Sequence, residues 1–174
     1  AHGELTIDDP VSSIKANPIE LALNDRIVED NTFNTNGNFL FKIIDGLTFN
    51  VGYGIIYINS QTKNFSASRQ SNTPDATRGS QEIYFLQNTN TLQYDKILGG
   101  VHRLTLTGVI EHQLFQNDRF QSTATNLQYP DFRYNNITLA GGLSSSAFYE
   151  KSTIRSFIGR VNYALLDKYL VTAS

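Results

Sequence analysis

Cysteine, methionine and tryptophan are all absent from the 174 residues. Without cysteine the chain forms no disulfide, no thiolate metal site and no cysteine nucleophile. No run of about 18 consecutive apolar residues occurs, and this length criterion excludes a transmembrane helix. A transmembrane β-strand is not excluded, because it needs only about 9–11 residues with every second one apolar. Residues 1–20 show no signal-peptide pattern, so we expect a processed chain or a piece of a longer one.

Charge is also scarce. Charged residues make up 17% of the chain, the net charge is -2, and the pI is about 5.9. Typical soluble domains carry about 25% charged residues, and here Asn, Thr, Ser and Gln take their place. No Lys/Arg cluster is present to follow a phosphate backbone, which argues against a nucleic-acid partner.

Groups for catalysis or metal binding are missing as well. The only histidines, His2, His102 and His112, stand at no metal-ligand spacing from one another or from a carboxylate. The serines at 144–146 lie in a polar stretch without a matching His and Asp set. We therefore expect no catalytic residue, no metal site and no cofactor, and a protein that is not an enzyme.

Alternation of apolar and polar residues is what the sequence does contain. In residues 31–43, Phe39 and Phe41 represent the largely apolar odd positions, and the even positions are mostly Asn and Lys. Such a period of two predicts a β-strand with one apolar face. Strands are expected at 31–43, 47–60, 82–94, 102–120 and 152–165, with a sixth beginning at 169.

The connections between these strands alternate in length. Short turns are expected at 44–46, 95–101 and 166–168, and long polar loops at 61–80 and 121–151. Outer-membrane barrels have this asymmetry, with short turns on one side and long loops on the other. The sequence therefore predicts an all-β fold of antiparallel, up-and-down transmembrane β-barrel strands, as an incomplete barrel of about six strands.

The polar faces of these strands are the feature with functional content. In a large barrel the inward face is wet, and neutral amides can hydrogen-bond to sugars or peptides without the desolvation cost of a charge. The alternative is that these residues only line water or meet other parts of the protein. The candidate lumen-facing polar residues are Asn34, Asn36, Asn38, Asn50, Arg160 and Asn162.

One segment carries a specific resemblance. Residues 156–174 read SFIGRVNYALLDKYLVTAS, which is similar to a strand, Asp-Lys turn and strand of the SusC-like family of TonB-dependent outer-membrane transporters. The hairpin around Asp45–Phe49, the strand end Thr91–Lys96 and the strand start at His102 also resemble that family. The resemblance covers most of the chain except the loops, and it corresponds to about six of the roughly 22 strands of a plugged transporter.

The resemblance implies a role and a set of partners. The parent protein would import glycan or peptide fragments across the bacterial outer membrane, with a SusD-like surface lipoprotein as its lid and TonB acting through a plug. Residues 1–26 would form an extracellular loop segment and residues 27–174 the partial barrel wall. Other expected partners are the remainder of the barrel and plug, outer-membrane lipid and barrel-assembly machinery. The alternative is a soluble β-sandwich, such as a carbohydrate-binding module, whose apolar face packs on a second sheet.

Overall fold

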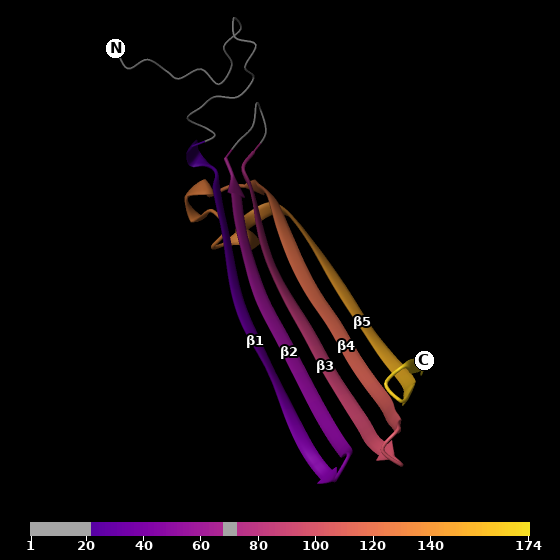
Figure 1. Ribbon diagram of the computed structural model, residues 1–174. Helices are drawn as coiled ribbons and strands as arrows, with labels where there is room; N and C mark the ends of the chain where they lie inside the picture. Colours follow the sequence, from indigo (N-terminus) through magenta and orange to yellow (C-terminus); the bar gives the residue numbers. More distant parts are fainter. Residues whose placement is uncertain (1–21, 68–72) are drawn as a thin grey trace, which may run out of the picture. The chain divides into compact units, whose positions relative to one another are not determined.

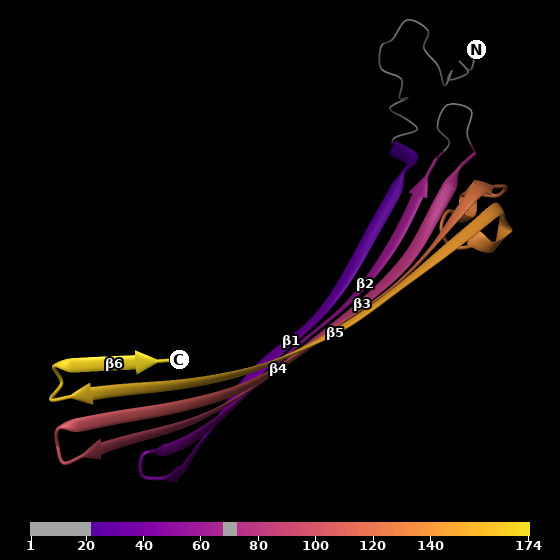
Figure 2. The same cartoon turned by 90° about the vertical axis from the view of Figure 1, so that its right-hand side faces the viewer.

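The computed structural model describes residues 22–67 and 73–174. Residues 1–21, and with them most of the expected extracellular segment 1–26, lie outside the described residues. Six strands account for most of the described chain; Figure 1 labels β1 to β5, and Figure 2 also labels β6. Their bounds are β1 Asp25–Ile44, β2 Leu47–Ser66, β3 Asp75–Leu98, β4 His102–Leu127, β5 Ala140–Leu165 and β6 Tyr169–Ala173.

The strands form one antiparallel sheet in the order β1-β2-β3-β4-β5-β6, so each strand pairs with its neighbour in sequence. The register of the last pair places Val161 opposite Ala173 and Leu165 opposite Tyr169, and Figure 2 shows this hairpin. The predicted all-β, up-and-down connectivity is therefore confirmed. No helix in the described part of the chain has the length and apolar character needed to cross a membrane.

The strands are longer than the sequence pattern predicted, and the long loops are correspondingly shorter. The connection expected at 61–80 occupies only 67–74, and the one expected at 121–151 occupies 128–139. The second connection contains two short 3-10 turns, Pro130–Phe132 and Ile137–Leu139. The predicted limits were wrong because backbone pairing continues where both faces of a strand are polar, and alternation then carries no signal.

The predicted tight turns are confirmed where positive φ angles are needed. Gly46 has φ +82, and a Cβ at this position would lie 2.2 Å from the carbonyl oxygen of Asp95. Gly46 also accepts a hydrogen bond from the Asp95 backbone N–H at 2.7 Å. In the last turn Leu166 and Asp167 take φ angles of 52 and 55, as a tight hairpin turn requires of its central residues.

The chain divides into two compact units, which we describe separately. The described part of unit 1 is 22–31, 58–67, 73–82 and 118–149, and unit 2 is 32–57, 83–117 and 150–174. Both long connections belong to unit 1 and all three short turns belong to unit 2. This grouping agrees with strict alternation of short and long connections along an up-and-down sheet.

Little of either unit is buried. In unit 1 a small cluster forms where the β4–β5 connection, residues 128–139, meets the ends of the strands. Its buried members are Phe65, Ala76, Ala124 and Leu127. Among the described residues of unit 2 the buried hydrophobic side chain is Ala164.

Candidate functional site

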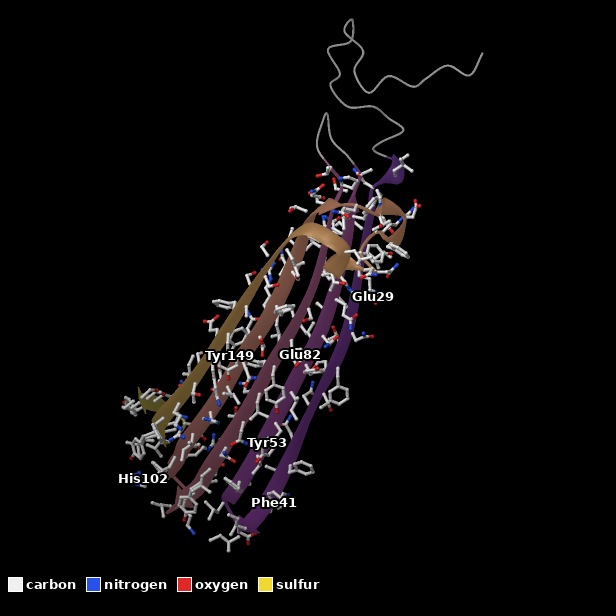
Figure 3. All side chains as sticks on the ribbon, turned by 180° about the vertical axis from the view of Figure 1, so that it is seen from behind. Glu29, Phe41, Tyr53, Glu82, His102 and Tyr149 are labelled. Atoms are coloured by element: carbon white, nitrogen blue, oxygen red, sulfur yellow. The ribbon has the colours of Figure 1, made fainter. Side chains whose placement is uncertain are left out.

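Many large apolar side chains of unit 2 are exposed. Phe39 and Phe41 on β1 expose 60% and 53% of their surface, and the side chains of Phe41 and Tyr53 are labelled in Figure 3. In a β-sandwich this face would be covered by a second sheet. The soluble carbohydrate-binding alternative is therefore not favoured. We call this surface the apolar face; its exposed members include Phe33, Phe39, Phe41, Tyr53, Leu92, Leu106, Ile110, Phe157 and Val161.

Aromatic side chains gather on this face near the short turns. The rings of Phe41 and Phe49 are stacked, with centroids 6.5 Å apart. His102 and Tyr163 are also stacked, with centroids 6.0 Å apart, and His102 Nδ1 shares a hydrogen bond with the Tyr163 hydroxyl at 2.7 Å. Aromatic girdles of this kind mark the interfaces of membrane proteins, where a ring meets hydrocarbon and a polar tip meets water.

The candidate lumen-facing residues of β1 and β2 lie on even positions. Asn34, Asn36 and Asn38 are exposed, and Asn50 is partly exposed. The Asn38 side chain lies over Gly52, because a Cβ on Gly52 would come within 2.8 Å of Asn38 Oδ1. Glycine at position 52 leaves room for the Asn38 amide. The Asn38 side chain therefore lies on the face toward which a side chain at position 52 would point.

The other two candidates lie at the opposite end of the sheet order. Arg160 is exposed and donates from Nε to Ser174 Oγ at 3.1 Å. Asn162 is partly exposed, and its Oδ1 accepts a hydrogen bond from the Thr172 hydroxyl at 3.0 Å. The structure therefore places the six candidates in two groups, one on β1–β2 and one on β5, with β3 and β4 between them.

Residues that the sequence reasoning did not select lie on these middle strands. Glu111 Oε1 accepts hydrogen bonds from the amides of Gln87, at 3.1 Å, and of Gln113. The two carboxylate oxygens of Asp95 accept from Thr105 and Gln93, at 2.6 and 2.7 Å. The sequence did contain a signal for these residues. They stand at odd positions of β3 and β4, and the leucines stand at even positions, so the polar residues are expected on the opposite face of the strands.

Two asparagines interrupt the apolar positions of β3, and their contacts explain how they are accommodated. Asn88 Nδ2 donates to the backbone oxygen of Gly52 at 3.1 Å, and Asn90 Nδ2 donates to Asn88 Oδ1 at 2.6 Å. Each amide thus has a partner within the sheet, which reduces the cost of placing it among apolar side chains.

The comparisons with known proteins agree with this geometry. No protein-family model matches the chain. TonB-dependent receptor P26 of Formosa agariphila is 30% identical over 95% of the chain and 18% of its own length. TonB-dependent receptor P3 of the same organism is 29% identical over 81% of the chain and 14% of its length. The structure of the RagAB peptide transporter superposes with a TM-score of 0.79 at 19% identity, over 96% of the chain and 20% of that structure's chain.

Over most of its length the chain is similar in sequence to a segment of these TonB-dependent receptors, and it shares the fold of the RagAB peptide transporter. The RagAB peptide importer in its open-open state also shares the fold, with a TM-score of 0.74. The chain spans about a fifth or less of the length of these relatives. The predicted barrel-strand fold is therefore confirmed, and the sequence similarity to TonB-dependent receptors supports the predicted family.

Side-chain contacts in unit 1 hold the β4–β5 connection against β1, and local patterning did not predict them. Arg133 Nη1 and the Tyr134 hydroxyl both donate to Asp25 Oδ2, each at 3.1 Å. The Arg133 guanidinium lies over the Phe65 ring, 5.8 Å from its centroid. These contacts attach the β4–β5 connection to the first residue of β1, where Figure 3 shows it crossing the ends of the neighbouring strands.

Desolvation raises the pKa of the Tyr134 phenol, and the hydrogen bond and negative charge of Asp25 raise it further. The phenol therefore remains protonated as a donor throughout the physiological range. Because the folded-state pKa is the higher one, the stabilisation by Tyr134 is fully present below the ordinary tyrosine pKa of about 10. It is lost as pH rises through the raised value.

Removing the Asp25 carboxylate is expected to loosen this connection. In Asp25→Ala, amide hydrogen exchange of residues 133–139 should accelerate roughly fivefold, because two charge-assisted hydrogen bonds are lost from a partly exposed site. Asp131→Ala removes an exposed carboxylate from the same connection and is the matched control. Equal exchange in both variants would show that the apolar cluster alone holds the connection.

Proposed function

We propose that the whole protein imports peptide or glycan fragments across the bacterial outer membrane, and that this chain supplies part of its wall and outer loops. The observation that carries the proposal is the division of unit 2 into an exposed apolar face and an amide-bearing opposite face. A barrel wall needs an apolar face toward lipid and a polar face toward a water-filled lumen. We assign residues 27–174 to the wall, residues 1–26 to the extracellular side, and no catalytic role to any residue.

The candidate lumen residues suit such cargo. Asn34, Asn36, Asn38 and Asn50 offer neutral donors and acceptors, which pair with sugar hydroxyls or peptide amides at a lower desolvation cost than charges would. The name of the RagAB peptide transporter supports the peptide alternative. As partners we propose the remaining barrel and plug, a SusD-like surface lipoprotein, TonB through the plug, assembly machinery and lipid; nucleic acid is not among them.

Uptake by the full-length protein tests the activity. Cells producing it should accumulate a labelled oligopeptide or a labelled oligosaccharide, and deletion of TonB should abolish this accumulation. Excess unlabelled peptide and excess unlabelled glycan, added separately, identify the cargo class. Accumulation that is unchanged without TonB would contradict energised import.

Labelling of single cysteines tests the assignment of the two faces. Because the chain has no cysteine, one can be introduced at a time without removing others from this segment. In the full-length protein in membranes, Asn36→Cys and Asn38→Cys should react with a water-soluble maleimide, whereas Phe39→Cys and Phe41→Cys should react far more slowly. Asn38 and Phe39 are adjacent on β1, so this pair compares the two faces at nearly the same depth. Faster labelling at the phenylalanine positions would reverse the assignment.

A further inference from the structure

Charged residues in the strands of unit 2 are sorted between the two faces of the sheet. The apolar face takes the even positions of β3 and β4 and the odd positions of β5. The carboxylates Asp95, Glu111 and Glu150 stand at the other positions and point away from this face. Lys151 and Arg155 stand at odd positions of β5, on the apolar face itself. Within the described strands of unit 2, the apolar face therefore carries positive charge and no carboxylate.

The basic residues continue the apolar face beyond a hollow in it. Ile110 of β4 and Phe157 of β5 line one hollow of about 510 Å³. Moving away from the short turns, the next side chains on this face are His112 and Arg155, two residues beyond each, and Lys151 follows on β5. Arg155 and Lys151 are exposed and His112 is partly exposed. Within the described part of the chain none of these three side chains has a hydrogen bond or an ion pair.

These residues stand one membrane-spanning length from the aromatic side chains near the short turns. His102 and Tyr163, which share a hydrogen bond of 2.7 Å, belong to that aromatic girdle. Counted from this pair, His112 lies ten residues further along β4 and Arg155 lies eight residues back along β5. A transmembrane strand needs about 9–11 residues, which places His112 and Arg155 at the opposite boundary of the hydrocarbon. In outer-membrane barrels the boundary away from the short turns belongs to the outer leaflet.

The hollow beside the basic residues is open along two glycines. Gly108 and Gly159 have nothing within 4 Å of where a Cβ would be. Both also line a second hollow of about 360 Å³, which continues past Leu106 and Val161. Six residues separate Arg155 from Val161, roughly 20 Å of strand at about 3.3 Å per residue. At a tilt of about 45° this is roughly 14 Å in depth, about half of the ~30 Å hydrocarbon core. The apolar path is therefore one leaflet deep.

We propose that this surface binds one outer-leaflet lipid whose headgroup carries phosphate. Arg155 binds the phosphate with two parallel hydrogen bonds, His112 and Lys151 donate further ones, and an acyl chain lies over Gly108 and Gly159. The lack of carboxylates on this face in the described strands of unit 2 favours an anionic headgroup over a zwitterionic one, whose ammonium group would have no partner. A second protein chain has no need of basic residues at a leaflet boundary. The inference rests on the proposed function, because it requires the apolar face to meet lipid.

Retention of lipid A, which carries phosphate, tests the headgroup end. The full-length protein in detergent is given lipid A or the same lipid without its phosphates, and bound lipid is measured by native mass spectrometry. Wild type should retain the phosphorylated form preferentially. Arg155→Gln should retain about tenfold less of it, because charge-assisted hydrogen bonds are lost. Lys42→Gln is the matched control, since it removes one positive charge from an exposed, even position of β1 on the opposite face.

The acyl-chain end is tested with Gly159→Leu, whose side chain occupies the hollow. This variant should retain about tenfold less of both lipids. Gly37→Leu is the matched control, since Gly37 lies at an odd position of β1 and also has open space at its Cβ. The proposal is overturned by equal retention of the two lipids in wild type, by equal losses in a variant and its control, or by retention of a second protein chain in place of lipid.

A photoactivatable lipid A provides a measurement that does not depend on how the variants fold. Crosslinks in the wild-type protein should concentrate on residues 106–112 and 155–161, and crosslinks spread evenly over the apolar face would overturn the site. The labelling of cysteines on β1 separates the two proposals. If Phe39→Cys is shielded but lipid A is not retained, only the lipid site fails; if Phe39→Cys is labelled rapidly, the membrane assignment fails.

Discussion

Arginine in place of Val51 is expected to destabilise the full-length barrel by about 2–4 kcal/mol, the range for a cation on the lipid face near the bilayer midplane. Val51 lies on β2 at an odd position, five residues beyond Gly46 of the short turn. At about 3.3 Å per residue and a tilt of about 45° it sits roughly 12 Å from that turn, near the middle of an apolar band about 25 Å tall. Urea titration of the protein folded into lipid vesicles measures this loss.

Asn50→Arg is the matched control for Val51→Arg. Asn50 precedes Val51 on the same strand, so the two side chains point to opposite faces at nearly the same depth. An arginine on a wet lumen face keeps its hydration and should change the unfolding free energy by less than about 1 kcal/mol. A larger cost at position 50 than at position 51 would reverse the two faces of the sheet.

Residues 1–174 expressed alone are expected to form no cooperatively folded monomer in plain buffer. Among the described strands β1 and β6 are the outer ones, and an outer strand leaves backbone donors and acceptors along its free edge without a strand partner. Burial of a phenylalanine or leucine contributes about 1.5–3 kcal/mol, whereas ordering each residue costs about 1–2 kcal/mol. The buried hydrophobic side chains in the described ranges are Phe65, Ala76, Ala124, Leu127 and Ala164, which is too few to offset that cost.

Near-ultraviolet circular dichroism and size measurements, in buffer and in detergent, test this expectation. We expect aggregation or a broad size distribution in buffer, and no sharp unfolding transition. The full-length protein in detergent is the control, because there both edges of the sheet have neighbours. A monomer in buffer with cooperative unfolding would contradict the membrane assignment as well as the need for partners.

The middle of each strand and the tight turns around Asp45–Gly46 and at 166–168 were predictable from the sequence, whereas the turn expected at 95–101 occupies only 99–101 because β3 continues to Leu98. Strict alternation, as at Phe39 and Phe41, identifies a strand with one apolar face, and Asp45–Gly46 identifies a hairpin by its φ requirement. The alternation of connection lengths then determined the order of the strands. For the candidate site, the sequence predicted which asparagines lie on the face opposite the apolar side chains. It did not predict the hydrogen bonds around Glu111 and Asp95.

The tertiary structure alone decided three features. The strands continue beyond the alternating region because ladder hydrogen bonds do not depend on which side chains flank them. Asp25 holds Arg133 across 108 residues of sequence, a distance at which no local pattern can indicate contact. Gly108 and Gly159, 51 residues apart in the sequence, line one hollow only because β4 and β5 are neighbours in the sheet. The sequence by itself determined which residues of each strand share a face, because side chains alternate with a period of two. Folding decided which distant residues meet, because pairing register is a property of the whole sheet.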